Sequence, residues 1–396
     1  MTMRRIVVVG NGIAGLTACD SLRSAGFEGE LTVVGAERHH PYSRPALSKA
    51  LLHGEDSLQA HELPQPTHEA AELLGVSATG LDPDARLVRL DGGGELPYDG
   101  LVIASGSRAK RLTEGQSEGD ARIPRELTLR TIEDAVLLKE LVEGRPSVIV
   151  IGGGPLGMEV ASGCLHMGCD VTLVSDATPL SRQLGDHLAG IFTSAAVRRG
   201  LCVVGGGKAR LADHGAGSRV VLADGTELEA DLVVTAIGDQ PNTEWLAGSG
   251  LLTDGALRVD SRGRLRPDIV AAGDVAFFPT SRGVQRIPLW TSAIDQAKAA
   301  AVGLLQGDAA PGFSFQPYFW TEGFGLSLKA AGFTPVAGTP DFCEPGDGPD
   351  SVLMRWDNQD GSGTAAAVNY RIPIPKLRRL ANTGPEALQR TAPAGV

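Results

Sequence analysis

Short apolar runs alternate along the chain with segments in which small and apolar residues recur at helical spacing. The runs at residues 5–9 (RIVVV) and 148–151 (VIVI) consist almost entirely of β-branched residues, and each leads through a glycine turn into such a segment. Buried strands that alternate with helices are typical of parallel βαβ units. We therefore predict an α/β fold.

The same glycine pattern, G-x-G-x-x-G, follows both runs. In such a turn the first glycine makes the tight bend, the second lets the backbone approach a pyrophosphate, and the third lets the helix pack closely on the sheet. The free N–H groups at the helix start then favour phosphate. Two copies in this context predict two dinucleotide cradles, whose glycines are Gly10, Gly12 and Gly15 in the first copy and Gly152, Gly154 and Gly157 in the second.

A glutamate ends the next predicted strand, at residues 30–37 (ELTVVGAE). Glu37 stands where an acidic residue of a dinucleotide-binding unit accepts hydrogen bonds from both ribose hydroxyls of an adenosine. A surface glutamate at a strand end is the alternative. A proline-punctuated loop at residues 39–52 then leads into a helix, and short strands and turns at residues 75–106 close the unit.

The rest of the chain repeats this alternation and then changes character. Residues 112–123 are polar and rich in glycine, which predicts a connector. From Pro317 the pattern becomes aromatic and alternating, which predicts a small mixed sheet, and residues 381–396 have the composition of a frayed terminus. Between them we expect a helix at 131–143, strands at 171–174, 218–224 and 230–238, and a helix from Thr291.

The bulk composition is that of an ordinary globular protein. The 396 residues allow two or three domains of about 100 to 200 residues, and 42% hydrophobic with 21% charged residues indicates neither disorder nor a membrane protein. No apolar run approaches the roughly 20 residues of a membrane span, and MTMRR leads straight into a strand, so we expect a cytoplasmic protein. The net charge of -11 disfavours nucleic acid and anionic membranes as partners.

The cysteines fit a reduced compartment, because their number is odd and their spacing is not that of a disulfide framework. They are Cys19, Cys164, Cys169, Cys202 and Cys343.

Six motifs in order resemble the pyridine nucleotide-disulfide oxidoreductase superfamily. More closely, the chain is similar to the ferredoxin reductase branch, which includes putidaredoxin, rubredoxin and biphenyl-dioxygenase reductases and apoptosis-inducing factor. The motifs are GNGIAG, PYSRPALSK, ASG at residues 104–106, GGGPLGME, AIG at residues 236–238, and IVAAGDVA.

This resemblance covers nearly the whole chain and implies a division of labour between the two cradles. The first would bind FAD and the second a nicotinamide dinucleotide. It implies a discontinuous FAD-binding domain at 1–112 and 239–316, an NAD(P)H-binding domain at 113–238, and a small α+β interface domain at 317–396. The two larger domains would be Rossmann-like.

The resemblance also assigns residues to cofactor binding. Asp274 would bind the ribityl or pyrophosphate region of FAD, with a helix cap as its alternative role, and Arg44 and Lys49 would flank the FAD. The full set is Gly10, Gly12, Ala14, Gly15, Glu37, Arg44, Pro45, Lys49, Ala78, Ala104, Ser105, Gly106, Arg130, Gly152, Gly154, Leu156, Gly157, Glu159, Ser175, Asp176, Gly238, Gly273, Asp274, Pro288, Leu289 and Trp290.

Disulfide reductases of this superfamily need a cysteine pair beside the flavin, soon after the first cradle or just before the second. Neither place has one, and PYSRPALSK holds no single cysteine. Cys164 and Cys169 follow the second cradle at the end of its helix, so we interpret them as packing residues. Electrons must then leave the flavin without a thiol relay.

Hydride transfer from nicotinamide to flavin needs orientation and electrostatics rather than a general base. Relatives pair the motif positions of Lys49 and Glu159, and we predict that these side chains meet beside the flavin N5. The alternative is that Lys49 is a solvated helix residue and Glu159 an ordinary exposed helix former. Trp290 and Trp320 match positions near the flavin, although core packing would also explain them. The candidate catalytic residues are Lys49, Glu159 and Trp320.

Two departures from the family pattern bear on specificity. The second strand of the nicotinamide domain usually ends in an acidic residue, and this chain has Ser175 there with Asp176 beside it. NADH and NADPH both stay open, with NADH favoured because a carboxylate repels a 2′-phosphate. The C-terminal motif usually reads close to WSDQYD but is WTEGFG here, on the face where the acceptor would dock, which leaves the acceptor open.

We therefore expect an NAD(P)H:ferredoxin oxidoreductase, a monomer or homodimer in which reduced FAD passes single electrons to a ferredoxin-type iron-sulfur protein that serves an oxygenase or a cytochrome P450. Two alternatives remain: a flavin oxidoreductase acting directly on a small organic substrate, and a redox-sensing interaction protein resembling apoptosis-inducing factor. An acidic ferredoxin would dock on positive charge near the flavin edge. The candidates are Arg282, Arg286, Lys329, Lys376, Arg378 and Arg379.

Overall fold

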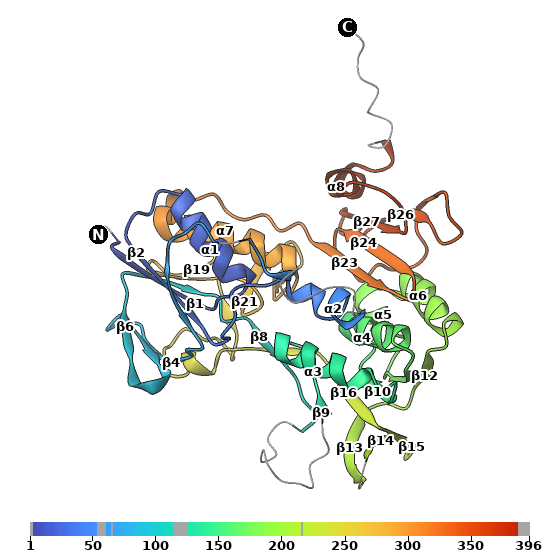
Figure 1. Cartoon of the computed structure of the whole chain (residues 1–396). Helices are drawn as coiled ribbons and strands as arrows, with labels where there is room; N and C mark the ends of the chain where they lie inside the picture. The colour runs from blue at the N-terminus through green and yellow to red at the C-terminus, as the bar shows by residue number, and fades with distance from the viewer. Residues whose placement is uncertain (1–2, 54–60, 65, 114–125, 215–216, 387–396) are drawn as a thin grey trace. The chain divides into compact units, whose positions relative to one another are not determined.

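The structure, a computed structural model, describes residues 3–53, 61–64, 66–113, 126–214 and 217–386 (Figure 1). Most of the predicted connector, and the chain from residue 387, lie outside the described residues. Two compact units are present: unit 1 is Met1–Ser43, Leu58–Arg108 and Gln240–Phe315, and unit 2 is Arg44–Ser57, Ala109–Asp239 and Gln316–Val396. Within the described ranges, no helix is long and apolar enough to cross a membrane.

A six-stranded sheet forms the centre of unit 1. The strand β1 (Arg5–Val9) lies between β2 (Glu30–Gly35) and β7 (Gly100–Ile103) and is parallel to both. In open α/β sheets, ligands bind at the carboxyl end of the strand where the order reverses, which here is β1. The full order is β19 (Arg264–Arg266), β20 (Ile269–Ala271), β7, β1, β2 and β3 (Ala71–Leu74).

Side chains of β1 are buried on both faces of this sheet, which explains its continuous apolar run. Val8 packs with α1 (Ile13–Ser24) and α7 (Trp290–Gln306), two helices that lie side by side (Figure 1). Val7 and Val9 enter a second core beneath two three-stranded sheets. These are β4 (Ala78–Asp82), β5 (Leu87–Leu90) and β6 (Glu95–Pro97), and β18 (Leu257–Arg258), β21 (Ala276–Thr280) and β22 (Gly283–Gln285).

Unit 2 repeats the design around a five-stranded parallel sheet. The strand β10 (Ser147–Ile151) lies between β11 (Asp170–Val174) and β16 (Leu232–Thr235), as β1 does in its sheet. The order is β12 (Cys202–Val204), β11, β10, β16 and β9 (Glu126–Leu127).

Helices and short strands complete this part of unit 2. The helix α3 (Ile132–Val142) begins at a capping box in which Thr131 and Asp134 bind each other's backbone N–H, which confirms the predicted helix start. The other helices are a 3-10 turn at Arg44–Ala46, α2 (Ala50–His53), α4 (Pro155–His166), α5 (Ser181–Leu184) and α6 (Asp186–Arg198). The strands β13 (Ala209–His214), β14 (Gly217–Leu222) and β15 (Glu227–Ala230) form an antiparallel sheet. Strands β8 (Ser107–Ala109) and β17 (Asp239–Pro241) pair where the chain passes between the units.

The C-terminal segment forms a second five-stranded sheet, and all of its neighbouring strands are antiparallel. The prediction of a mixed sheet is therefore wrong. Hairpins such as the two-residue turn at 324–325 reverse the chain, whereas parallel neighbours need a long crossover. The order is β23 (Tyr318–Gly323), β24 (Leu326–Ala331), β27 (Gly363–Val368), β26 (Val352–Asp357) and β25 (Phe342–Pro345), and α8 (Ile374–Thr383) packs on this sheet.

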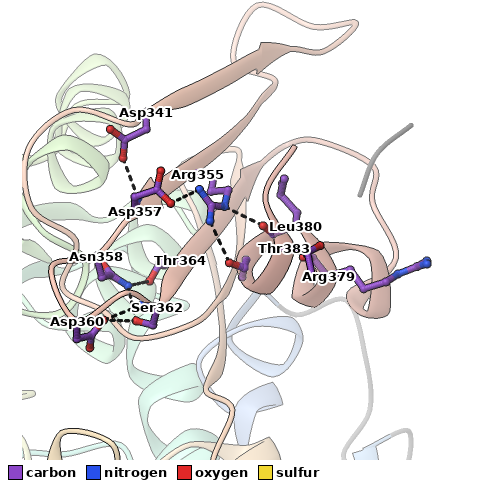
Figure 2. A network of polar contacts seen from close by, with 11 residues as sticks. Asp341, Arg355, Asp357, Asn358, Asp360, Ser362, Thr364, Arg379, Leu380 and Thr383 are labelled. Atoms are coloured by element: carbon purple, nitrogen blue, oxygen red, sulfur yellow. Dashed lines mark hydrogen bonds and ion pairs between the residues drawn. The ribbon is translucent and has the colours of Figure 1, made fainter. Parts of the chain in front are cut away.

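Arg355 of β26 fastens α8 to the sheet (Figure 2). Its Nε donates to the carbonyl oxygen of Leu380 at 2.9 Å, and its other guanidinium nitrogens bind Asp357 and the carbonyl of Ala381. A guanidinium at a helix C-terminus satisfies unpaired carbonyls and favours the negative end of the dipole. Gly363 allows the close approach, because a Cβ there would lie 2.1 Å from the oxygen of Ala381.

We expect Arg355→Met to loosen α8 by about 1–2 kcal/mol, because the carbonyl of Leu380 loses its charged donor. Hydrogen–deuterium exchange of the α8 amides should become faster while β1 and β10 keep their protection. The exposed Arg371, substituted in the same way, serves as the control. Equal exchange in α8 of the Arg355 variant and the control would contradict this role.

Candidate functional site

The two predicted cradles have the same backbone geometry. Gly10 donates its N–H to Val34 at 2.7 Å in unit 1, and Gly152 donates to Val174 at 2.8 Å in unit 2. On the other side, Ala104 donates to Val9 and Ala236 donates to Ile151. Each turn is thus held between the two neighbouring strands by equivalent hydrogen bonds.

Glycine is required at the first and third positions because backbone approaches backbone. A Cβ on Gly10, whose φ is +115°, would lie 2.0 Å from the oxygen of Ala104, and one on Gly152 would lie 2.3 Å from that of Ala236. A Cβ on Gly15 would lie 1.8 Å from the oxygen of Gly10, and the equivalent distance from Gly157 to Gly152 is 1.9 Å. These four glycines let each helix begin directly against its strand.

The middle glycines face open space instead. A Cβ on Gly12 would meet nothing within 4 Å, and one on Gly154 would meet only the Nε2 of Gln183 at 3.8 Å. Each is the N-cap of its helix, α1 or α4, with no side-chain cap and no acidic residue in the first turn. The N–H groups of both helix starts are thereby left for a phosphate, so both cradles fit a dinucleotide.

The predicted site residues divide between the units. Unit 1 holds Gly10, Gly12, Ala14, Gly15, Glu37, Ala78, Ala104, Ser105, Gly106, Gly273, Asp274, Pro288, Leu289 and Trp290. Unit 2 holds Arg44, Pro45, Lys49, Arg130, Gly152, Gly154, Leu156, Gly157, Glu159, Ser175, Asp176, Gly238 and Trp320.

Glu37 follows β2 at the end of the first cradle. Its Oε2 accepts a hydrogen bond from the hydroxyl of Tyr42 at 2.5 Å. This bond fixes one carboxylate oxygen. The geometry suits a residue that must hold a ribose in one orientation.

The turn around Asp274 is held from three directions. Gln296 of α7 accepts from the N–H of Gly273 at 2.9 Å, and Ser107 of β8 donates to the Asp274 carboxylate at 3.3 Å. Arg286 donates to the carbonyl of Asp274 at 3.2 Å. Nearby, Ser105 donates to the carbonyl of Asn242, whose amide donates back to the carbonyl of Ser105.

Asn11 is a polar residue of the first cradle that the motif analysis missed. Its amide nitrogen and oxygen are both buried, and neither has a hydrogen-bond partner in the structure. Its Cβ lies 2.8 Å from where a Cβ on Gly35 would stand, at the end of β2. Buried amides normally have partners, so this side chain fits a bound group in the cradle. The second, variable letter of GNG was the only sequence feature that could have indicated it.

The end of β11 departs from the family pattern in a physically clear way. Ser175 is buried, donates to the carbonyl of Ala177 at 2.7 Å, and points at Gly153, where a Cβ would lie 2.4 Å from its Oγ. Its hydroxyl is therefore engaged inside the protein. Asp176 is exposed and pairs with Arg182 at 2.9 Å. The chain just after β11 thus carries a carboxylate and a guanidinium together.

Lys49 and Glu159 meet, as predicted. The Nζ of Lys49 lies 2.8 Å from Oε1 of Glu159, and both residues belong to unit 2. Glu159 is 7% exposed and lies in the second turn of α4. Thr321 donates to the same oxygen at 2.6 Å, and Ser48 donates to the other one. No sequence motif indicated either hydroxyl, and the position of this cluster relative to the flavin stays a prediction.

Arg44 fastens the segment that carries Lys49. Its guanidinium donates to the carbonyl of Arg130 at 2.5 Å, just before the capping box of α3. The Nζ of Lys49 also donates to the carbonyl of Pro45 at 3.4 Å. The PALSK segment is therefore held to α4 through Lys49 and to the chain before α3 through the neighbouring Arg44.

The WTEGFG motif is largely directed inward. Thr321 and Phe324 are buried, and Trp320 is partly buried and stacks on Tyr318 with ring centroids 6.0 Å apart. Only Glu322 and Gly325 are exposed. The side chains of Thr321 and Phe324 are therefore covered by the protein itself, and the position of this segment on the docking face stays a prediction. Trp290 is the first residue of α7 and belongs to unit 1, and its place near the flavin stays a prediction.

All five cysteines are described and free. Cys164 and Cys169 are buried, and burial raises the pKa of the Cys164 thiol to about 12. A thiol held in its neutral form is a poor nucleophile. The interpretation of these two residues as packing residues agrees with this environment.

Comparisons with known proteins place these motifs in a family. A model of the pyridine nucleotide-disulphide oxidoreductases matches residues 4–297. The chain is 34% identical over 334 residues to the ferredoxin--NAD(+) reductase component of the p-cumate 2,3-dioxygenase system of Pseudomonas putida, across 83% of this chain and 81% of that protein. It is 33% identical over 413 residues to the corresponding component of the anthranilate 1,2-dioxygenase system of Burkholderia cepacia, across 97% and 95%.

A solved structure agrees with these relatives. The reductase in the crystal structure of the covalent putidaredoxin reductase-putidaredoxin complex matches with a TM-score of 0.80 and 29% identity, over 92% of this chain and 90% of that one. The fold, the doubled cradle and the family model all point the same way. The chain belongs to the pyridine nucleotide-disulphide oxidoreductase family.

Proposed function

We propose that the protein is an NADH-dependent reductase that passes electrons one at a time to a ferredoxin-type iron-sulfur protein serving an oxygenase or a cytochrome P450. FAD and NADH are its cofactors, and FAD, when bound, supplies the exchange between a two-electron donor and a one-electron acceptor. The observation that carries the proposal is the pair of equivalent cradles, each with an open middle glycine. Relatives named as ferredoxin--NAD(+) reductase components support it.

The state of the cysteines supports transfer of electrons from the flavin to the acceptor without a thiol relay. The family includes enzymes that use a thiol pair, but the cysteines within α1 and α4 are buried and all five are free. The chain's own contribution is then to bind both nucleotides, exclude water and place charge. Free thiols also support a reducing compartment, and we assign the protein to the cytoplasm.

The three-domain organisation belongs to the same proposal. Unit 1 would be the FAD-binding domain, while unit 2 would combine the NADH-binding domain with the C-terminal interface domain. The C-terminal sheet supports this, because it has its own core around Leu353, Leu377 and Leu380. Basic residues of this segment would receive the acidic acceptor.

Anaerobic stopped-flow reduction by NADH and NADPH, followed by mixing with a ferredoxin, a quinone and oxygen, tests the function. We expect fast reduction by NADH and fast reoxidation by the ferredoxin. Fast reoxidation by the quinone alone would instead favour action on a small organic substrate. A stable reduced protein that none of the three reoxidises would favour a redox sensor.

The first cradle allows a prediction that separates binding from folding. Gly12→Ala should leave the unfolding of the FAD-free protein unchanged, because its Cβ enters open space, but should weaken FAD binding at least tenfold by blocking the pyrophosphate. Gly15→Ala should destabilise the FAD-free protein as well, because its Cβ collides with the oxygen of Gly10. Thermal unfolding and FAD titration measure the two effects. Normal FAD affinity in the Gly12 variant would remove the first cradle as the site.

The second cradle predicts opposite shifts in nucleotide preference. Asp176→Asn should raise the ratio of kcat/KM for NADPH over NADH by about five- to tenfold, because a repulsive charge is lost. Arg182→Ala should lower the same ratio, because it leaves the Asp176 charge unpaired. Steady-state kinetics with both nucleotides provide the measurement. Shifts in the same direction would show that this pair does not contact the ribose.

The basic residues of the C-terminal segment predict that electron transfer to a ferredoxin depends on salt concentration. Lys376→Glu and Arg379→Glu on α8 should each slow ferredoxin-coupled turnover several-fold at low salt, and the difference from wild type should shrink as salt rises. Reduction by NADH should stay unchanged. The exposed Arg210 of β13, changed to Glu, is the control. Coupled turnover that is indifferent to ionic strength would exclude steering by these charges.

A further inference from the structure

The carboxylate of Glu159 is bound by three donors from two distant segments of the chain. Oε1 accepts from Lys49 at 2.8 Å and from Thr321 at 2.6 Å, while Oε2 accepts from Ser48. Ser48 and Thr321 are themselves buried, at 4% and 2% exposure. These contacts all lie within unit 2. Both oxygens are therefore fixed, and the carboxylate cannot rotate without breaking a hydrogen bond.

The hydroxyl of Thr321 comes from the C-terminal sheet, which the family resemblance linked to the electron acceptor. Thr321 lies in β23, and Glu159 lies in α4, the helix that starts at the second cradle. One helical turn further along, Ser162 accepts from the N–H of Phe324 at 2.8 Å. The residue pairs 159/321 and 162/324 have the same spacing of three. The hairpin thus docks on α4 in one register.

The turn of this hairpin is built to stay in place. Phe324 has a φ of +54°, which is unfavourable for a bulky residue, and yet it is only 4% exposed. Gly325 follows with a φ of +72°, and a Cβ there would lie 2.2 Å from the guanidinium of Arg199. Contacts with α4 and with Arg199, the residue that caps the C-terminus of α6, therefore hold a turn whose backbone conformation is costly by itself. Thr321 lies in the strand that leads into this turn, so its position is fixed as well.

We propose that Thr321 and Ser48 are positioning residues of the reductive half-reaction, which hold the Glu159 carboxylate so that it and Lys49 keep one arrangement toward the nicotinamide. The inference rests on the proposed function, because it concerns reduction of the FAD-containing protein by NADH. It gives the C-terminal segment a part in hydride transfer as well as in acceptor docking.

A buried carboxylate such as that of Glu159 needs hydrogen-bond donors to hold it in one orientation. A carboxylate with free lone pairs in a buried site would turn toward whichever donor approached, including the carboxamide of the nucleotide. With Thr321 and Ser48 in place, the Lys49 ammonium retains a fixed distance to Oε1 and the remaining lone pairs point one way. Small errors in such geometry slow a reaction strongly, whereas they weaken ground-state binding less.

Thr321→Val removes the hydroxyl and keeps the shape, so it is the primary test. In anaerobic stopped-flow experiments with the FAD-loaded protein and NADH, without any acceptor, we expect the limiting rate of flavin reduction to fall about tenfold. The dissociation constant for NADH and the FAD content should stay near wild type. Ser48→Ala should act in the same direction, and Thr321→Ser should restore most of the rate.

Ser162→Ala is the matched control, because it removes the neighbouring hydrogen bond between the hairpin and α4 without touching Glu159. Its limiting rate should stay within about twofold of wild type. A Thr321→Val variant reduced at the wild-type rate would overturn the inference, and so would an equal loss in the Ser162 and Thr321 variants, which would indicate hairpin docking alone. A Thr321→Val defect that appears only with ferredoxin present would assign the residue to acceptor docking instead. A wild-type protein that NADH does not reduce would overturn the proposed function itself.

Discussion

The approach of backbone to backbone at the start of α1 and α4 is the constraint on which both nucleotide sites depend. The third glycine of each motif stands so close to the first that a single methyl group would lie within 2 Å of a carbonyl oxygen. Only this contact lets the helix start point its free N–H groups at the end of β1 or β10. Because the constraint is steric and local, it is written in the sequence as glycine and appears twice in nearly identical form.

The second organising feature is a buried charge, and its demands are long-range. Glu159 needs donors in a site with little water, and it obtains them from residues more than a hundred positions away on either side. Loss of one partner of a buried ion pair typically costs about 3–5 kcal/mol, because the other charge stays buried. The PALSK segment, α4 and the C-terminal hairpin therefore stabilise one another in unit 2. The contacts that position the Glu159 carboxylate are therefore also contacts that stabilise the fold of unit 2.

These two features explain how far the sequence could be interpreted. Local patterns predicted the strands, the cradle glycines and the start of α3 at Thr131, and the family resemblance predicted the contact of Lys49 with Glu159. The contacts of Ser48 and Thr321 and the position of Asn11 were not predicted, because the residues that surround a serine, threonine or asparagine in the sequence do not indicate which distant group it will contact. The mixed sheet was a wrong prediction for a related reason: alternation identifies strands, but strand direction depends on turns such as 324–325, where a phenylalanine with positive φ is an unusual turn residue.

The chain at the end of β11 departs from the motif that the family resemblance predicts. Replacement of the usual acidic residue by Ser175 removes a carboxylate from the strand end, and the serine turns inward because Gly153 leaves room for its hydroxyl. The negative charge has moved one residue along the chain, to Asp176, where Arg182 partly neutralises it. A neutralised carboxylate still accepts hydrogen bonds from ribose hydroxyls but repels a phosphate less. If this end of β11 receives the ribose, as proposed, nucleotide discrimination would be a balance between two exposed, opposite charges rather than the effect of one buried acid.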